Sequence, residues 1–366
     1  MKLFGRKAAG RAEARPVFAR VSGMPGNGWP SSYEAQVREG YLGNAVAQRA
    51  VRLVAESVGT APLSASDAAL AALVAARSAG QGLIETLAAQ LLLHGNAYCQ
   101  VLTATDGTVR ELFALRPERV SVEADAGGWP VAYRYRVGTS EARLSVADAG
   151  RPEVIHLKAF HPLDDHYGLG CLGAAAGAIA VHNAAARWNK ALLDNAARPS
   201  GALVYAPDDG STLSAEQFER LRAEMDAGFA GAGNAGRPML LEGGLTWQAL
   251  SLSPVEMDFA GTKAAAREIA LAFGVPPMLL GLPGDATYAN YREANRALWR
   301  LAVLPLAETI LSGIARGLGG WFVDASLMVD VNQVSALAED RERLWRQVAA
   351  ADFLSVAEKR AMLGVG

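Results

Sequence analysis

A helix with an abrupt end is encoded by Lys263-Ala-Ala-Ala-Arg-Glu-Ile-Ala-Leu-Ala-Phe-Gly274-Val-Pro-Pro-Met-Leu-Leu-Gly281. Ile269 and Phe273 lie on a helical apolar pattern. Gly274 stands where a helix commonly ends, and the two prolines just beyond it prevent continuation. Met278 to Leu280 then form an apolar plug. The stretch therefore predicts a helix, a fixed stop and a change of direction.

A second long helix is predicted after a small polar loop, Leu282 to Asn290. It starts at Tyr291, and its apolar residues are spaced as one helix face: Ala294, Leu298, Leu301 and Ala302. Pro305 lies inside this helix. Proline lacks the amide hydrogen and clashes with the carbonyl of Leu301, so we expect a kink that costs about 3 kcal/mol.

The sequence of this region resembles the portal proteins of tailed phages. The similar motifs are Gly-Val-Pro-Pro-x-Leu-Leu-Gly, Tyr-x-Asn at Tyr288–Asn290, and Glu-Ala-Asn-Arg-Ala-Leu-Trp at Glu293–Trp299, followed by Leu-Pro. The resemblance is to the Hong Kong 97 type, including the portals of gene transfer agents. It implies a first helix that lines the channel of a ring, a loop that projects into it, and a kinked spine helix. Without this resemblance, the apolar and turn residues of the region predict only an ordinary helix-loop-helix.

Composition limits the classes of protein. The chain has 366 residues, enough for two or three globular units, and 51% of them are hydrophobic. The net charge of −2 provides no bulk basic field for nucleic acid. Cys99 and Cys171 make no disulfide framework. The start lacks the apolar core of a signal peptide, and no run of 18 apolar residues occurs. We expect a soluble intracellular protein.

Residues 1 to 30 predict a flexible basic arm, because they contain several lysines and arginines but a single acidic residue, Glu13. Proline and glycine are also frequent in this stretch. The simple interpretation is a solvated tail. The alternative is a tether to DNA or to an acidic partner.

Residues 31 to 172 predict an α+β unit, with helices first and an antiparallel meander after them. The strands are expected at Ala97–Thr103, Val109–Leu115, Val120–Val122, Val131–Val137 and Val154–Lys158. Leu91-Leu-Leu-His-Gly-Asn-Ala-Tyr98 and Leu115-Arg-Pro117 resemble the region that forms the wing of portals.

Gly168-Leu-Gly-Cys-Leu-Gly173 matches the G-x-G-x-x-G fingerprint of dinucleotide-binding folds, with Asp194 about twenty residues on. The geometry argues against that site. Seven residues, His161 to Tyr167, separate the preceding strand from the first glycine, and Asp194 lies in a helical context. The portal family has a loosely similar segment here, although this chain carries Cys171 in place of the usual Ser and lacks the following Pro.

Three histidines, His156, His161 and His166, lie near Asp164 and Asp165 and suggest metal ligands. They lack the spacing of a known metal motif, so we expect a strand histidine and a polar loop instead. Cys99 fits a small core residue. The chain has no Gly-Lys dipeptide, no G-x-S-x-G and no C-x-x-C. We expect no enzyme, no cofactor and no metal.

A compact insert is predicted at residues 202 to 252. It contains a strand at Ala202–Tyr205, a helix opened by the capping box Ser214-x-x-Gln217, and a hairpin at Met239–Trp247. The run Asn234 to Gly244 resembles the clip of portals. Near the end, Ser326–Val331 predicts a strand, and a second capping box, Ser355-x-x-Glu358, opens the last helix.

The resemblance implies an α+β portal fold with these parts: arm 1–30, wing 31–172, helix into the stem 173–201, clip 202–252, stem helix 253–281, tunnel loop 282–290, kinked spine 291–319, wing return strand 320–340 and crown 341–366. It implies a ring, commonly a dodecamer, at one capsid vertex, with assembly in the bacterial cytoplasm. The implied partners are double-stranded DNA, the large terminase, a head-tail adaptor and the major capsid or scaffold protein; no membrane is implied.

The resemblance also assigns candidate sites. The DNA-channel loop holds Gly284, Asp285, Ala286, Thr287 and Tyr288; the stem helix holds Lys263, Arg267 and Glu268; the clip contact holds Asn234, Arg237 and Glu242. Two alternatives stay open. One is an NAD-dependent oxidoreductase that uses Gly168–Gly173, which predicts a parallel sheet. The other is a different neck ring protein, such as an adaptor.

Overall fold

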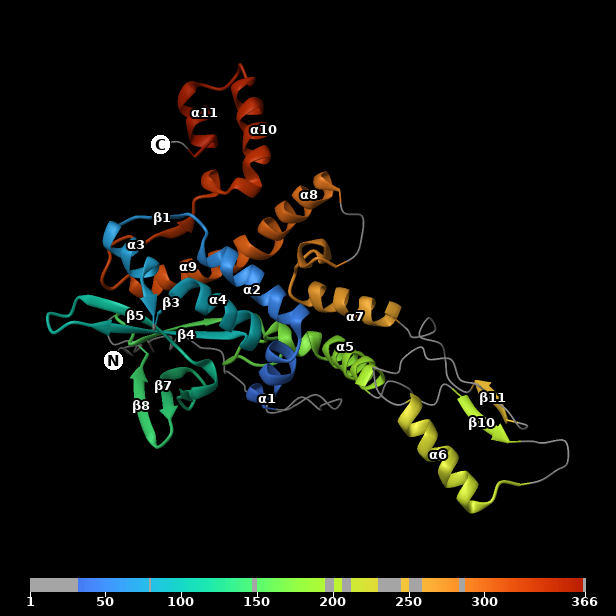
Figure 1. Ribbon diagram of the computed structural model, residues 1–366. Helices are drawn as coiled ribbons and strands as arrows, with labels where there is room; N and C mark the ends of the chain where they lie inside the picture. The colour runs from blue at the N-terminus through green and yellow to red at the C-terminus, as the bar shows by residue number, and fades with distance from the viewer. Residues whose placement is uncertain are drawn as a thin grey trace, which may run out of the picture. The chain divides into compact units, whose positions relative to one another are not determined.

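The computed structural model describes residues 32–78, 80–146, 150–194, 201–205, 212–229, 245–249, 259–282 and 287–364 (Figure 1). The chain divides into two compact units, residues 1–176 with 268–366, and residues 177–267. The division falls inside two helices, α5 (Cys171–Asp194) and α7 (Phe259–Ala272). The predicted basic arm lies outside the described residues.

The first unit opens with helices. They are α1 (Tyr33–Val37) with a π-helical turn at Arg38–Leu42, α2 (Ala45–Gly59), α3 (Ala68–Ala75) and α4 (Leu83–His94). The apolar pattern from Ser32 to Val58 in the sequence predicts one helix, and the structure divides this stretch. A new helix starts after Asn44 because its buried side-chain oxygen accepts a hydrogen bond from the amide of Ala47 at 2.9 Å. α2 then packs against α4.

Two three-stranded sheets follow, in the orders β5-β4-β9 and β6-β7-β8. Their strands are β4 (Asn96–Thr103), β5 (Val109–Leu115), β6 (Val120–Ala124), β7 (Pro130–Val137), β8 (Ser140–Ser145) and β9 (Val154–Lys158). Short pairs join β1 (Leu63–Ala65) to β12 (Leu327–Val329) and β2 (Arg77–Ser78) to β3 (Gln81–Gly82). Every strand pair in the described residues is antiparallel, which confirms the predicted α+β class.

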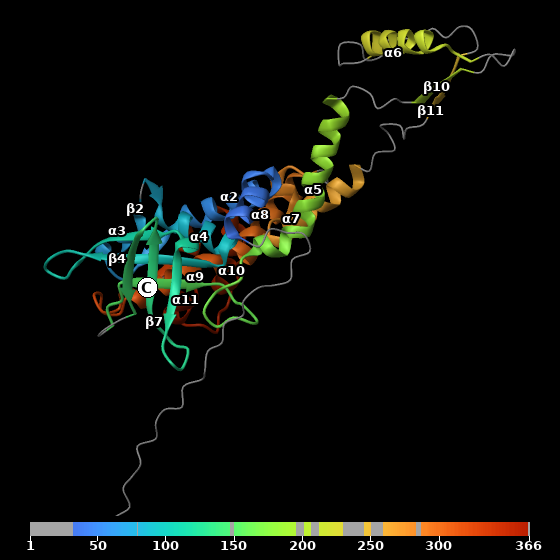
Figure 2. The ribbon, with the colours of Figure 1, turned by 90° about the horizontal axis from the view of Figure 1, so that it is seen from below.

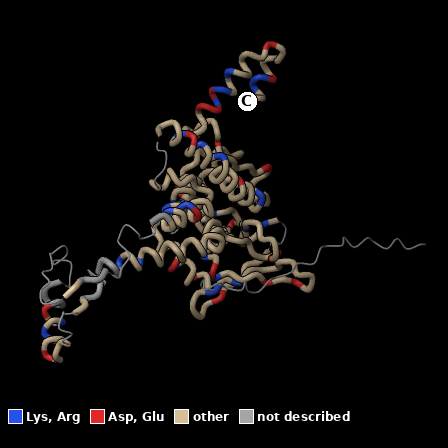
Figure 3. Tube along the Cα trace, turned by 90° about the vertical axis from the view of Figure 1, so that its right-hand side faces the viewer, with Lys and Arg blue, Asp and Glu red and all other residues tan. Residues whose placement is uncertain are grey.

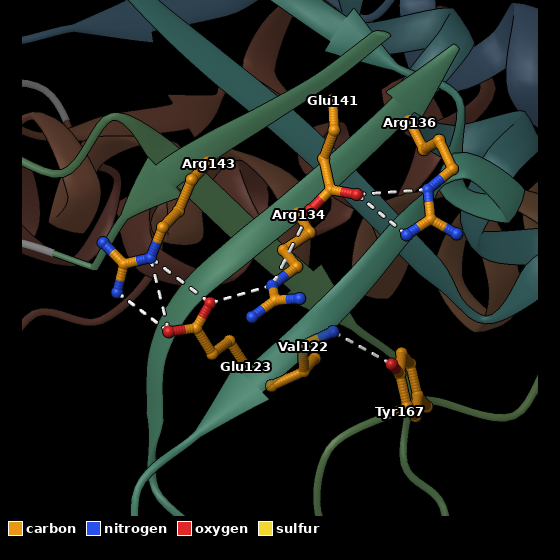
Figure 4. A network of polar contacts seen from close by, with 7 residues as sticks. All are labelled: Val122, Glu123, Arg134, Arg136, Glu141, Arg143 and Tyr167. Carbon is orange, nitrogen blue, oxygen red and sulfur yellow. Dashed lines mark hydrogen bonds and ion pairs between the residues drawn. The ribbon is translucent and has the colours of Figure 1, made fainter. Parts of the chain in front are cut away.

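The two larger sheets share a core. It contains Tyr98, Leu115, Val120, Tyr133, Leu144 and Val154. The outer face of β6-β7-β8 instead carries a ladder of ion pairs (Figure 4). Arg134 lies directly opposite Arg143, a repulsive arrangement, and Glu123 offsets it by accepting hydrogen bonds from both guanidinium groups. β8 was missed from sequence because only Leu144 within it is buried.

One long helical run follows the loop after residue 282. It consists of α8 (Tyr288–Leu298), a π-helical turn at Trp299–Val303, and α9 (Leu304–Leu318). Pro305 falls in the first turn of α9, directly after the π-helical turn, where a missing amide hydrogen costs least. The predicted interruption at this proline therefore takes the form of a π-helical turn within a continuous helix.

α9 packs closely on β9 because two of its residues are glycines. A Cβ at Gly313 would lie 2.2 Å from the Leu157 side chain, and one at Gly317 would lie 2.5 Å from that of Ile155. The run Tyr288–Leu318 is long and apolar enough to cross a membrane, judged by length and composition alone. In this fold Ile310 is fully buried, as in the core helix of a globular unit.

The first unit ends in two helices, α10 (Ala338–Ala349) and α11 (Val356–Met362), and the predicted capping box between Ser355 and Glu358 is present. Blue and red segments alternate along these helices in Figure 3. Asp340 of α10 lies 3.4 Å from Arg296 of α8 and 3.9 Å from Arg300. These ion pairs tie the base of the terminal hairpin to the long helix.

The second unit contains the rest of α5, then β10 (Gly201–Tyr205), α6 (Ala215–Phe229), β11 (Leu245–Ala249) and the start of α7. The predicted capping box opens α6: the amide of Gln217 donates to the Ser214 hydroxyl at 3.2 Å. β11 pairs with the distant β10 rather than only within a local hairpin. The described part of the stem helix begins at Phe259, because residues 250–258 lie outside the described residues.

Candidate functional site

α7 has two distinct faces. Ala265, Ala266, Ile269, Ala270 and Phe273 are buried on one side.

The other face of α7 carries the predicted stem residues, and Lys263, Arg267 and Glu268 are all exposed. Lys263 and Arg267 are one helical turn apart and so face the same direction. Leu271 continues this face and is also exposed. The helix therefore presents charged and apolar groups together on its exposed side.

The predicted stop after α7 is confirmed in detail. The amide of Gly274 donates to the carbonyl of Leu271, and that of Val275 donates to Ala270, both at 2.9 Å. This is the Schellman pattern, and it requires the left-handed backbone that Gly274 adopts at a φ of +66°. A short 3₁₀ turn at Pro277–Leu280 follows, and the residues of the predicted apolar plug in it are half-buried.

The loop that joins the two helices is shorter than predicted. Gly284, Asp285 and Ala286 lie outside the described residues. Thr287 caps α8, since its hydroxyl accepts a hydrogen bond from the amide of Asn290 at 3.2 Å. Tyr288 is therefore the first residue of the helix, and its assignment to the loop was wrong. The sequence did not reveal this cap, because Thr287 stands among other small and polar residues and is not distinguished from the loop by its residue type.

Tyr288 and Tyr291 present aromatic rings on the exposed first turns of α8. The guanidinium carbon of Arg292 lies 5.3 Å from the centre of the Tyr288 ring. The clip candidates Asn234, Arg237 and Glu242 lie outside the described residues.

Two of the side chains considered as metal ligands, His161 and Asp164, instead bind backbone groups of the loop before α5. The ring Nδ1 of His161 accepts from the amides of Leu163 and Asp164, and a carboxylate oxygen of Asp164 accepts from the amides of His166 and Tyr167. Within the described residues, no three His, Cys, Asp or Glu side chains are grouped to hold a metal ion.

His156 is part of a buried network. Its ring stacks on Tyr98 with 4.3 Å between centroids, and its Nε2 donates to the Asn96 side-chain oxygen at 3.0 Å. Burial lowers the pKa of His156 to about 3 and that of His94 to about 4. Burial also raises the pKa of Cys99 to about 12, so this thiol is no nucleophile at neutral pH.

These histidines predict that stability falls as the pH falls. A histidine in an unfolded chain has a pKa of about 6.5. Below that pH the unfolded chain binds protons at His156 and His94, whereas the folded chain binds them only near pH 3 to 4. Protonation therefore favours the unfolded state as the pH falls from about 6.5. A His156→Gln variant should therefore lose about 2 kcal/mol less stability than the wild type between pH 7 and pH 5. Urea unfolding at both pH values measures this; equal losses in the two proteins contradict it.

The glycine fingerprint is used for backbone packing. A Cβ at Gly168 would lie 2.0 Å from the carbonyl oxygen of Gly95, and one at Gly170 would lie 2.5 Å from that of Leu93. At Gly173 no atom beyond the adjacent turns of its own helix lies within 4 Å of such a Cβ. In a dinucleotide site the third glycine is the one that allows close helix packing, and the sheet is parallel. Neither condition holds in the described residues, so the oxidoreductase alternative has no support.

Comparison with known proteins identifies the family. The sequence profile of the phage portal protein family matches residues 45–364. The chain belongs to the phage portal protein family. A chain in the virion of a native gene transfer agent (GTA) particle is 48% identical, with a TM-score of 0.76, and the match covers 94% of this chain and 96% of that one. The predicted family and portal fold are thereby confirmed.

Other proteins are similar to this portal-family chain. A chain in the neck of a native GTA particle, computed with C12 symmetry, is also 48% identical, with a TM-score of 0.76 over 92% of this chain and 94% of that one. An uncharacterized protein of Rickettsia bellii is 39% identical over 346 residues, 89% of this chain and 88% of the relative. The probable portal protein of Streptomyces phage phiC31 is 28% identical over 334 residues, 85% of this chain and 72% of that protein.

Proposed function

We propose that this chain is the portal subunit of a phage-like particle, and that twelve copies form a closed ring at one vertex of the capsid. The observation that carries the proposal is the 48% identity, across 94% of the chain, to a protein in a GTA virion. The C12 symmetry of a related neck structure supports the number of copies. The role is structural, and the chain itself supplies no chemical step.

We assign the channel to the exposed face of α7 and to the loop before α8. Lys263, Arg267 and Glu268 line the stem, and Gly284, Asp285 and Ala286 face the DNA. Non-specific grip on DNA comes from neutralising phosphates, and the net charge of −2 does not provide it. In Figure 3, blue and red segments are interspersed along the described chain. A channel without a bulk positive charge suits DNA that must slide past, and Asp285 repels phosphate.

The other proposed parts follow the portal plan. The insert at residues 202–252, with Asn234, Arg237 and Glu242, docks the large terminase during packaging and the head-tail adaptor afterwards. Residues 31–172 form the wing, which meets the major capsid or scaffold protein, and residues 341–366 form the crown. The ring assembles in the bacterial cytoplasm and remains at the portal vertex of the particle.

Added positive charge in the loop tests the channel assignment. Changing Gly284 and Ala286 to Lys should reduce nuclease-protected DNA in particles by at least about tenfold, since each Lys adds a phosphate contact that slows sliding. The matched control carries Gln at both positions and should package normally. Both variants should form rings. Normal packaging by a lysine variant that is present in the particles contradicts a loop that faces the DNA.

A further inference from the structure

Three arginines of the long helix contact acidic residues of the C-terminal hairpin, α10 and α11. Arg292 forms an ion pair with Glu339, and Arg296 lies 3.4 Å from one carboxylate oxygen of Asp340. Arg300 lies 3.9 Å from the other oxygen of Asp340. A guanidinium group binds phosphate with the same paired hydrogen bonds that it forms with a carboxylate. The acids of α10 therefore occupy side chains that are chemically suited to a nucleic-acid backbone.

Positive charge is in excess where the long helix meets the hairpin. The ion pairs of this junction join four arginines and three acids: Arg292, Arg296, Arg300, Arg343, Glu293, Glu339 and Asp340. The net charge of this set is +1, and without Glu339 and Asp340 it would be +3. The side chains of Arg292 and Arg300 are 51% and 62% exposed, so an anion outside the subunit can reach them.

The hairpin has little apolar packing of its own. Every residue of α10 and α11 is described, and Val348 is the only one of them that is buried. In Figure 1 the red hairpin projects from its unit near α8. Ion pairs between exposed side chains are weak and are screened by salt. The contact of Glu339 and Asp340 with α8 is therefore reversible, and another anion can compete for the same arginines.

The first of these arginines lies close to the loop that we assign to the channel. α8 begins at Tyr288, directly after that loop, and Arg292 is four residues further, about 6 Å along the helix axis. The guanidinium carbon of Arg292 lies 5.3 Å from the centre of the Tyr288 ring. Both ribbon views place α8 beside the end of α7, and α8 contacts the 3₁₀ turn at Pro277–Leu280 that follows α7 (Figures 1 and 2). DNA that passes the proposed channel loop therefore passes Arg292.

We infer that Glu339 and Asp340 act as an internal substitute for phosphate: they hold the arginines of α8 in ion pairs and keep them from gripping the DNA. The inference rests on the proposed function, because it takes the loop before α8 to face the duplex. Each free arginine would add a phosphate contact and slow the sliding of DNA. The hairpin then lowers the affinity of the channel for DNA, and displacing it from α8 raises that affinity.

DNA binding by the purified full-length protein tests the inference. The variant that combines Glu339→Gln with Asp340→Asn should bind a short fluorescent DNA duplex at least about tenfold more tightly than the wild type at low salt, as measured by fluorescence anisotropy. The slope of log affinity against log salt concentration should steepen by about 2 to 3, since each of the three arginines would displace about one counterion.

A matched control removes the same charge from the same hairpin. It combines Glu342→Gln with Asp352→Asn; Glu342 pairs with Arg346 of its own helix rather than with α8. This control should bind DNA as the wild type does. Equal affinities of the two double variants at every salt concentration overturn the inference.

Removing the arginines should reverse the effect. When Arg292, Arg296 and Arg300 are also replaced by Gln in the protein that carries Glu339→Gln and Asp340→Asn, its affinity for DNA should return to the wild-type level. Tighter binding that persists comes from other groups and contradicts the inference. Asp340→Glu keeps the charge and should bind as the wild type does, and tighter binding by this variant also counts against the inference.

The inference and the proposed ring fail separately. If the wild type forms no ring, the proposed function fails. If rings form, particles that carry Glu339→Gln with Asp340→Asn should hold less nuclease-protected DNA than particles that carry Glu342→Gln with Asp352→Asn. Equal DNA contents overturn the inference and leave the ring in place.

Discussion

A Gly168→Ala variant should lose at least about 3 kcal/mol of stability, because the added methyl group has no space. Its Cβ would lie 2.0 Å from the Gly95 carbonyl oxygen and 2.7 Å from both the amide nitrogen and the carbonyl oxygen of Ala159. All three contacts are with backbone, so relief requires two strand ends and the loop to separate.

Gly173→Ala is the matched control from the same fingerprint. It lies in α5, where no atom beyond the adjacent turns of its own helix is within 4 Å of the added Cβ, and alanine favours a helix over glycine by about 0.5–1 kcal/mol. Thermal unfolding of the unassembled proteins should therefore show that Gly168→Ala melts well below the wild type. Gly173→Ala should melt at the wild-type temperature or slightly above it. Equal melting of the two variants contradicts this packing.

Asn96→Leu is expected to cost about 3 kcal/mol, because it leaves buried donors without partners. Asn96 is 1% exposed, and its oxygen accepts from the amide of Gly168 and from His156 Nε2. Its amide group donates to the carbonyl of Gly168 at 3.2 Å. Leucine is larger than asparagine, so the substitution leaves no cavity, and the loss comes from the unpaired polar groups together with overpacking of the buried site.

Gln100→Leu, in the same strand, provides the control for Asn96→Leu. Its side chain is half-buried and makes no hydrogen bond with the described part of the chain, so we expect a change within about 0.5 kcal/mol. Urea unfolding compares the two. A loss at position 96 no larger than at position 100 would show that the network does not hold the loop between β9 and α5 in place.

The sequence predicted most helices and strands because their signals are local. The alternating apolar residues in the sequences of β6 and β7, the stop at Gly274 and the capping boxes at Ser214 and Ser355 all lie within a few residues of the elements that they define. β8 was missed because its residues are mostly charged and exposed. The family was reached by resemblance of motifs rather than by physical argument.

The networks could not be predicted, because their partners are far apart in sequence. The Asn96 amide binds Gly168, 72 residues away, and Arg296 of α8 meets Asp340, 44 residues away. No periodic pattern reports such pairs. The sequence showed that His161 and His166 precede the glycine fingerprint, but their part in fixing the loop between β9 and α5 became visible only in three dimensions.

The native mass of the purified protein, measured by light scattering and followed by negative-stain imaging, tests the central proposal most directly. We expect a particle of about twelve times the 38.4 kDa subunit mass, with a central hole. A chain that remains a monomer or dimer at every concentration tested, and that gives no ring in the images, contradicts the account.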